Sequence, residues 1–124
     1  MSEASRSIRG GEARNCDGYK LYKGDKTSTS WTGPSWYKFV YPAGTKMATK
    51  PPPVRTCGTR ATGWMTTEHP SEIGQTKSVI YCCIWNGNKC WRKSFGEVTK
   101  CGEEDFVYRL PNVAQCTARY CAVP

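Results

Sequence analysis

Eight cysteines in a chain of 124 residues constrain the fold more than any other feature of the sequence. An even number of cysteines at this density is typical of a small secreted domain cross-linked by disulfides. Zinc binding is the competing interpretation, but no C-x-x-C pair is present and His69 is the only histidine. We therefore expect an oxidising compartment, four disulfides, and no bound metal or other cofactor. The cysteines are Cys16, Cys57, Cys82, Cys83, Cys90, Cys101, Cys116 and Cys121.

The apolar content of the chain is low, so a stable single domain depends on these cross-links. Hydrophobic residues make up 38% of the chain, a count that includes the cysteines and seven tyrosines. Leucine and isoleucine are scarce, and the core must therefore use the five tryptophans, the tyrosines and the disulfides.

The net charge of +8 favours acidic partners. Sulfated or sialylated glycans, anionic membranes and nucleic acids all qualify by charge, but a secreted setting argues against nucleic acid. The basic residues are scattered and nowhere form a run of four, which is typical of a solvated surface that keeps a protein soluble. We expect the partner to be a glycan or an extracellular protein, with acidic ones included, and not a nucleic acid.

Residues 1–15 are rich in serine, arginine, glycine and glutamate and have little apolar surface to bury. We expect them to form a flexible N-terminal tail, followed by one domain at 16–124. No stretch approaches the length of a membrane span, and the first residues lack the apolar run of a signal peptide. The expectation is a secreted protein with no transmembrane segment, whose signal peptide is not in this chain.

Hydrophobic alternation, together with β-branched and aromatic residues, predicts strands in five segments. The segments are 16–22, 36–41, 77–85, 90–99 and 106–110. Asn86-Gly87 predicts a tight hairpin turn between two of them, because both residues tolerate a positive φ.

The remaining segments are expected to be irregular. Loops are predicted at 23–34 and 57–70, a stiff polyproline segment at 51–53, and either a strand or a helical turn at 116–121. The fold class is therefore a small disulfide-rich, β-dominated single domain with short antiparallel strands, long loops and little helix.

Cys82 and Cys83 are adjacent, and a bond between them would be strained. If they lie in a strand, their side chains point to opposite faces of the sheet. We expect them to pair with two different cysteines, and the spacing leaves the rest of the connectivity open.

Short motifs follow one another in a definite order from Cys16 to the C-terminus. They are Cys16-x-x-Tyr19-x-Leu21, Trp36-Tyr37-Lys38-Phe39, Gly44-x-Lys46-Met47, Cys57-Gly58-Thr59, Gly63-Trp64-Met65, His69-Pro70, Cys82-x-x-Trp85, Cys90, Cys101, Val107-Tyr108-x-Leu110, Cys116 and Tyr120-Cys121. Together they resemble the uromodulin-type eight-cysteine domain of animal cell-surface mosaic proteins. The resemblance implies a non-enzymatic extracellular module, and it places Trp36, Trp64 and Trp85 in motifs that we expect to belong to the core.

The chain departs from that family in its cysteines and in its glycosylation sites. Relatives usually carry one cysteine where this chain has 27–35 and another near Lys50-Pro51, which suggests one disulfide fewer here. Relatives present a high-mannose glycan as a decoy for bacterial adhesins, and that role requires an N-x-S/T sequon. None of the four asparagines begins a sequon, so the decoy role does not transfer to this chain.

No catalytic residue is expected. General acid–base chemistry has only His69 available, and we expect its ring to hydrogen-bond a backbone carbonyl and pin its loop. The acids Glu103, Glu104 and Asp105 are adjacent, which is typical of a solvated turn rather than of a catalytic carboxylate pair. The sequence therefore predicts a protein that is not an enzyme, with a secreted hydrolase as the last alternative.

Trp31 and Trp91 lie outside the family motifs and are the candidates for ligand contact. Trp91 precedes Arg92 and Lys93, and an aromatic ring beside two cations suits a sulfated glycan or a lipid headgroup. We predict a lectin-like, adhesion or host-defence module that binds its ligand through Trp31, Trp91, Arg92 and Lys93. The alternatives are a cationic antimicrobial or toxin-like effector acting on anionic membranes, and a structural spacer of a mosaic protein.

Overall fold

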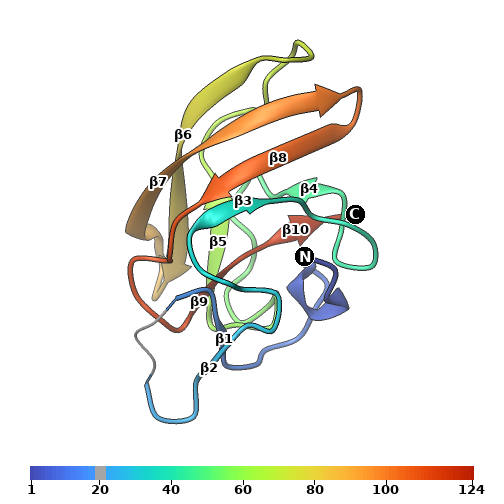
Figure 1. The fold of residues 1–124 in the computed structure, drawn as a ribbon. Coiled ribbons are helices and arrows are strands. Elements are labelled where there is room, and N and C mark those ends of the chain that lie inside the picture. The colour runs from blue at the N-terminus through green and yellow to red at the C-terminus, as the bar shows by residue number, and fades with distance from the viewer. Residues whose placement is uncertain (19–21) are drawn as a thin grey trace.

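The computed structural model describes residues 1–18 and 22–124, and its elements are almost entirely β-strands (Figure 1). In chain order they are η1 (Ala4–Arg6), β1 (Asn15–Cys16), β2 (Lys26–Thr27), β3 (Ser35–Tyr37), β4 (Lys46–Met47), β5 (Ala61–Met65), β6 (Thr76–Trp85), β7 (Asn88–Gly102), β8 (Asp105–Leu110), β9 (Ala118–Tyr120) and β10 (Ala122–Val123). The described residues contain one short 3-10 turn and no α-helix. The β-dominated fold class is thus confirmed.

Six strands form the main sheet in the order β3-β8-β7-β6-β5-β9. The consecutive strands β6, β7 and β8 pair antiparallel across its centre, and β5 extends the sheet antiparallel to β6. β9 joins β5 in a parallel pair, which departs from the expected antiparallel arrangement and brings the end of the chain beside its middle (Figure 1). Two small sheets, β1 with β2 and β10 with β4, complete the fold.

The β6–β7 hairpin confirms the strand and turn predictions made for this part of the chain. Its turn residues Asn86 and Gly87 have φ values of 51° and 80°, as a tight turn requires. Farther along β7, a Cβ atom at Gly96 would lie 2.1 Å from the carbonyl oxygen of Arg109 and 2.7 Å from the Tyr81 ring. Only glycine therefore lets β8 and the Tyr81 ring approach β7 this closely.

The core lies on one face of the main sheet. In β8, Phe106, Tyr108 and Leu110 alternate as the buried residues, with the two-residue period of a half-buried strand. Val98 of β7 is buried in the same cluster. Trp36 was expected in the core, but it pairs with the outward-facing Arg109 and is 47% exposed.

The structure corrects several predicted boundaries. The segment 57–70 was expected to be a loop, but it contains β5, which is buried on both faces and therefore lacks the alternation of a half-buried strand. The strand predicted at 36–41 ends at Tyr37. The strand predicted at 16–22 contributes only its first residue to β1, and its residues 19–21 lie outside the described part of the chain. At 116–121 the strand alternative is correct.

Residues 1–15, expected to be a flexible tail, pack against the C-terminal strands instead. Arg6 is fully buried, and its guanidinium donates to the two carboxylate oxygens of Asp17 at 2.6 and 2.9 Å. It also donates to the carbonyl of Tyr120 at 3.0 Å, while the backbone N–H of Ile8 donates to the carbonyl of Ala122. The composition of the segment did not reveal this packing, because a buried ion pair and backbone hydrogen bonds hold it together with the contacts of Met1 and Ile8.

Three disulfides form where four were expected: Cys16–Cys116, Cys57–Cys121 and Cys82–Cys90. All eight cysteines lie in the described residues, and two of them, Cys83 and Cys101, are unpaired.

The register of the hairpin explains why these two cysteines stay apart. Cys83 is opposite Arg92, whereas Cys101 lies near the other end of β7, roughly 30 Å away at about 3.3 Å per residue. That separation is far beyond the Cα distance of about 7 Å that a disulfide can bridge. Burial raises the pKa of the Cys83 thiol to about 12, so this thiol is protonated and inert at neutral pH.

Candidate functional site: an aromatic and basic pocket

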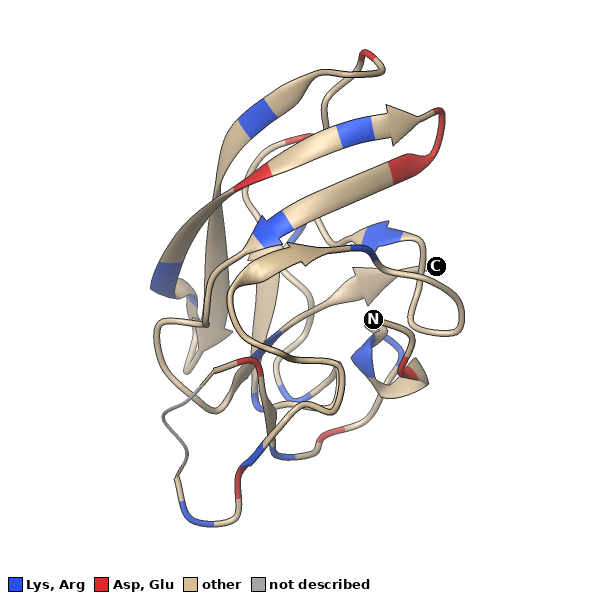
Figure 2. Ribbon diagram, viewed as in Figure 1, with Lys and Arg blue, Asp and Glu red and all other residues tan. Residues whose placement is uncertain are grey.

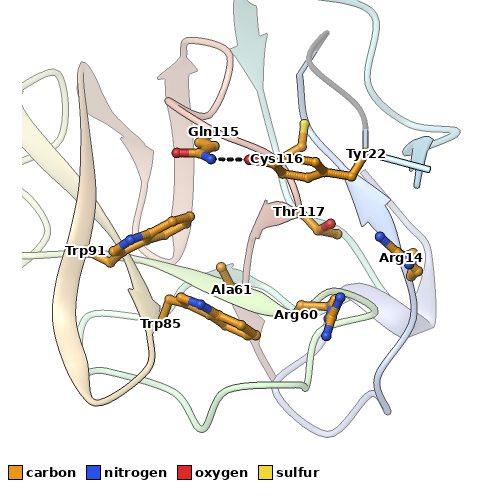
Figure 3. Close-up of a pocket in the computed structure, with 9 residues that line it drawn as sticks. All are labelled: Arg14, Tyr22, Arg60, Ala61, Trp85, Trp91, Gln115, Cys116 and Thr117. Carbon is orange, nitrogen blue, oxygen red and sulfur yellow. Dashed lines mark hydrogen bonds between the residues drawn. The ribbon is translucent and has the colours of Figure 1, made fainter. Parts of the chain in front are cut away.

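A pocket of about 240 Å³ opens beside the turn end of the β6–β7 hairpin (Figure 3). We call it the Trp85–Trp91 pocket, and Figure 3 shows both indole rings on one side of it, with Tyr22 and Arg14 across from them. The residues that line it are Arg14, Tyr22, Arg60, Ala61, Trp85, Trp91, Gln115, Cys116 and Thr117. Two arginines and no carboxylate are among them.

The two strands of the hairpin position the tryptophans. Trp85 is the last residue of β6, and Trp91 lies in β7 just after the turn. Their ring centroids are 6.4 Å apart and the ring planes meet at 51°, so the indoles form a wedge. The Cys82–Cys90 disulfide crosses the hairpin and fixes the backbone immediately before Trp91. The wedge is therefore built on a covalently closed hairpin.

The rest of the pocket comes from distant parts of the chain. Ala61 begins β5, and Thr117 precedes β9 beside the Cys16–Cys116 disulfide. The amide of Gln115 donates from Nε2 to the hydroxyl of Tyr22, which joins two loops above the tryptophans (Figure 3). Disulfides and hydrogen bonds thus hold the pocket open in one shape.

Three guanidinium groups lie over the two indole rings. The Cζ atom of Arg92 is 4.2 Å from the ring centroid of Trp91. Those of Arg55 and Arg60 are 5.3 and 5.5 Å from the centroid of Trp85. These are cation–π distances, and the stacking places positive charge next to both aromatic walls.

Carboxylates outside the pocket neutralise the nearby arginines unequally. Arg14 donates from Nε to Asp25 at 2.6 Å, and Arg55 donates to Glu12 at 2.7 Å. Arg60 Nε is 3.6 Å from the same oxygen of Glu12, which is too long for a hydrogen bond. This Nε atom is buried and has no hydrogen-bond partner among the described residues. Arg60 therefore keeps a free donor.

The structure separates the four residues predicted to contact a ligand. Trp91 lines the pocket, and Arg92 stands at its rim, where its Nε donates to Gln115 Oε1 at 2.9 Å. Lys93 is exposed and does not line the pocket. A binding role for these three residues stays a prediction.

Trp31, the fourth of them, is a core residue and not a surface one. It is 5% exposed, its ring stacks on Tyr37 with centroids 4.9 Å apart, and its Nε1 donates to Asn112 at 3.0 Å. Both the ring and the N–H of this indole have partners within the protein, so we withdraw Trp31 from the candidate site.

Most of the pocket has no local signal in the sequence. Trp85 was assigned to the core because it belongs to a family motif, although it is partly exposed and forms one wall. Arg14, Tyr22, Arg60 and Gln115 come from four separate segments, and only the tertiary fold brings them together. The one sequence feature that could have indicated the pocket is the Asn86-Gly87 turn with Trp85 before it and Trp91 after it.

His69 has a structural role, but with a different partner from the backbone carbonyl that was expected. Its Nε2 is 2.7 Å from the hydroxyl oxygen of Tyr108, which also accepts a hydrogen bond from the N–H of Met47. With the Met47 N–H already bonded to it, the Tyr108 hydroxyl can donate its own proton to His69 when Nε2 carries no hydrogen. Burial, with a smaller contribution from Lys46, lowers the pKa of His69 to about 4, so the ring is neutral at pH 7.

Charged residues are distributed over the sheet, the loops and the N-terminal segment rather than gathered on one element (Figure 2). In the acidic turn after β7, Glu103 and Glu104 are exposed, whereas Asp105, the first residue of β8, is partly buried. Asp105 lies 2.5 Å from Lys38, and Glu104 lies 3.6 Å from Lys46. Within the described ranges, no helix is both long enough and apolar enough to cross a membrane.

Comparison with known proteins agrees with the motif resemblance. The family described as a uromodulin-like domain matches residues 37–122. The pancreatic secretory granule membrane major glycoprotein GP2 of dog is 32% identical over 98% of this chain and 21% of its own length. The human GP2 protein is 35% identical over 72% of this chain and 17% of its own length. Rat uromodulin is 32% identical over 72% of this chain and 14% of its own length. The chain spans about a fifth or less of the length of these relatives, and it belongs to the uromodulin-like domain family.

Proposed function

We propose that the chain is a non-enzymatic extracellular recognition module that binds a glycan in the Trp85–Trp91 pocket. The observation that carries the proposal is the wedge of two partly exposed indole rings in a preformed pocket of about 240 Å³. Aromatic faces offer apolar contact with polar groups close by, which is typical of ligand sites. Beyond its bonds to Tyr22 and Arg92, the amide of Gln115 retains one N–H donor and one acceptor lone pair for the hydroxyls of a sugar.

An extracellular location is supported by the cross-links and by the relatives. Three disulfides close loops between parts of the chain far apart in sequence or across the hairpin, as in proteins of oxidising compartments. The names of the relatives describe a glycoprotein of secretory granules, which belongs to the same secretory route.

The chemistry of the pocket favours binding over catalysis. Among the residues that the structure describes, no histidine, aspartate or glutamate lines the pocket, and these are the usual groups for proton transfer near neutral pH. Its one cysteine, Cys116, is held in a disulfide. His69 is neutral and engaged with Tyr108 in a different part of the molecule.

A glycan array with the oxidised chain tests the proposal. We expect binding that is lost in Trp91→Ala and kept in Trp36→Ala. Trp36 is a matched control, because it is an exposed tryptophan at the opposite edge of the same sheet. Binding that survives Trp91→Ala would place the ligand elsewhere.

The other functions that the sequence left open have their own outcomes in this test. No glycan binding, together with capture of a defined extracellular protein, would favour a protein partner. Leakage of anionic vesicles that salt suppresses would favour a cationic membrane effector, although the dispersed charges in Figure 2 provide no basic stripe for it. Absence of all three activities would favour a structural spacer.

A further inference from the structure

We infer that the Trp85–Trp91 pocket selects an acidic sugar unit, and that Arg60 binds its carboxylate or sulfate group. This inference rests on the proposed function and specifies the ligand of the same pocket. It does not follow from the net charge of the chain, because it depends on one arginine among many.

The first step is the sign of the charge at the pocket. Arg14 and Arg60 belong to its lining, Arg92 stands at its rim, and no acidic side chain is among the lining residues. The arginines in and around the pocket outnumber the two carboxylates that pair with them, Asp25 and Glu12, so an anion would be attracted. In a partly enclosed site this attraction is weakened by water less than on an open surface.

The second step is that, among these arginines, Arg60 alone has a side chain with no hydrogen-bonded partner among the described residues. Arg14 is already bonded through Nε to the buried carboxylate of Asp25, and Arg92 is bonded through Nε to Gln115. Arg60 competes with Arg55 for Glu12, and Arg55 is the closer of the two, at 2.7 Å against 3.6 Å.

The buried Nε of Arg60 is therefore left without an acceptor among the described residues of the free protein. Arg60 can therefore bind an oxyanion in the pocket through its terminal Nη groups without giving up a hydrogen-bonded carboxylate. Guanidinium groups match carboxylate and sulfate-like oxyanions because two parallel N–H donors meet two oxygens.

The third step is the size and shape of the site. Pockets for drug-sized ligands have volumes of about 300 Å³ or more. The Trp85–Trp91 pocket, at about 240 Å³, is smaller, so it suits one sugar ring rather than a longer chain. The wedge of the indoles would contact the apolar face of that ring, with its charged group directed to Arg60, which lies beside Trp85 in Figure 3.

The test uses the oxidised chain and four probes: sialyllactose, its carboxylate methyl ester, a sulfated lactose and plain lactose. Affinities are measured by calorimetry or tryptophan fluorescence at about 150 mM salt and repeated near 1 M. We expect sialyllactose or sulfated lactose to bind at least about tenfold more tightly than lactose and the ester, as a charge-assisted hydrogen bond implies. Which of the two binds more tightly identifies the acidic group.

Arg60→Gln should remove this preference and leave binding at the level of lactose. Arg109→Gln is the matched control, because it removes the same charge from an exposed arginine on the outer face of the sheet. The methyl ester makes the same comparison with an unaltered protein, so the result does not depend on the folding of Arg60→Gln.

Each outcome decides the inference. Equal losses in Arg60→Gln and Arg109→Gln would overturn it, since overall charge would then explain binding. Equal affinities for lactose and the acidic probes, still abolished by Trp91→Ala, would overturn it and leave the proposed function intact. Binding of no probe and no other glycan would overturn both.

Discussion

Arg6 and Val98 are both completely buried, yet the segments that carry them are held by different interactions. Arg6 is fixed by the carboxylate of Asp17 and the carbonyl of Tyr120, so ionic hydrogen bonds hold the N-terminal segment. Val98 sits among apolar side chains on the inner face of the β6–β7–β8 sheet. A segment of charged residues can therefore be as firmly placed as a strand, provided that each buried charge has its partner.

The disulfides also differ between the N-terminal half and the β6–β7 hairpin. Cys16–Cys116 and Cys57–Cys121 join residues 100 and 64 positions apart and fasten the N-terminal half to the C-terminal strands. The hairpin has one local disulfide, with a separation of 8. Both free cysteines lie on its strands. Closing long loops restricts the unfolded chain more, so cross-links matter most where apolar packing is least.

The strongest challenge to this comparison is Arg6→Met. The substitution keeps much of the side-chain volume but leaves the buried carboxylate of Asp17 without its cation. We expect a loss of about 3–5 kcal/mol in the free energy of unfolding, measured by urea titration with tryptophan fluorescence. The control Arg9→Met alters an exposed arginine of the same segment and should change stability by less than about 0.5 kcal/mol. Similar losses in both variants would show that the ion pair does not hold the segment.

Leu110→Ala makes the corresponding change on the apolar side. Leu110 is fully buried at the end of β8, and its removal leaves a cavity in the sheet core. A loss of about 3 kcal/mol is expected in the same urea titration. A loss below about 1 kcal/mol would mean that the core collapses around the gap and that apolar packing at Leu110 contributes little to the stability of the sheet.

Acid should weaken the two regions in different pH ranges. His69, near the sheet core, has a pKa of about 4 in the fold against 6.5 unfolded, chiefly because it is buried. Glu3, in the N-terminal segment, has a pKa of about 2 against 4.5; burial opposes this shift, but the hydrogen bond to Ser30 and the charge of Arg6 outweigh it.

Folding lowers both pKa values, so the unfolded chain takes up each proton first as the pH decreases. The free energy of unfolding therefore decreases as the pH decreases. For His69 the loss should begin below pH 6.5 and be complete near pH 4; for Glu3 it should begin below pH 4.5 and continue toward pH 2. The free energy of unfolding should be measured by urea titration at a series of pH values. His69→Gln should reduce its dependence on pH between about 6.5 and 4, and Glu3→Gln should reduce its dependence on pH below about 4.5. A profile that either variant leaves unchanged would contradict the assignment of that range.

The smallest effect is expected for Cys101→Ser. Cys101 is exposed and unpaired, so its replacement should change stability by less than about 0.5 kcal/mol. The native chain should react with one equivalent of a thiol reagent at Cys101, and a second equivalent, at Cys83, should require unfolding. If the native chain showed no fast reaction, or if Cys101→Ser lost much stability, Cys101 would be paired. A fourth disulfide would then have to be present.

Local pattern predicted the hairpin correctly because its determinants are local. The apolar run in 77–85, rich in β-branched and aromatic residues, and the turn residues Asn86-Gly87 act within a few residues of one another. β5 was missed because it is short and contains Ala61 and Gly63, which have low β-propensity, and because its neighbour β9 is distant in sequence. The N-terminal segment was missed because composition does not reveal that Arg6 meets Asp17.

The candidate site was only partly predictable for the same reason. Trp91 and Arg92 are neighbours in sequence, and their aromatic–cation pairing could be proposed from that alone. The opposite wall, with Arg14 and Tyr22, comes from the segments around β1, and Arg60 reaches Trp85 only because β5 pairs with β6. Exposure of Trp31 could not be judged without knowing that Tyr37 covers it.

The parallel pairing of β5 with β9 also determines the order in which the chain can fold. Ala61 is paired with Ala118, and Ser7 forms a bridge with Ala122, so these contacts close very large loops and form slowly. A ribosome that has released β5 to β8 has released a complete meander, but β9 and β10 are still missing. During that interval the free edge of β5 is open to pairing with another chain. Ser7 is therefore synthesised before all the strands of the main sheet, but it reaches its final position only after β10 is available.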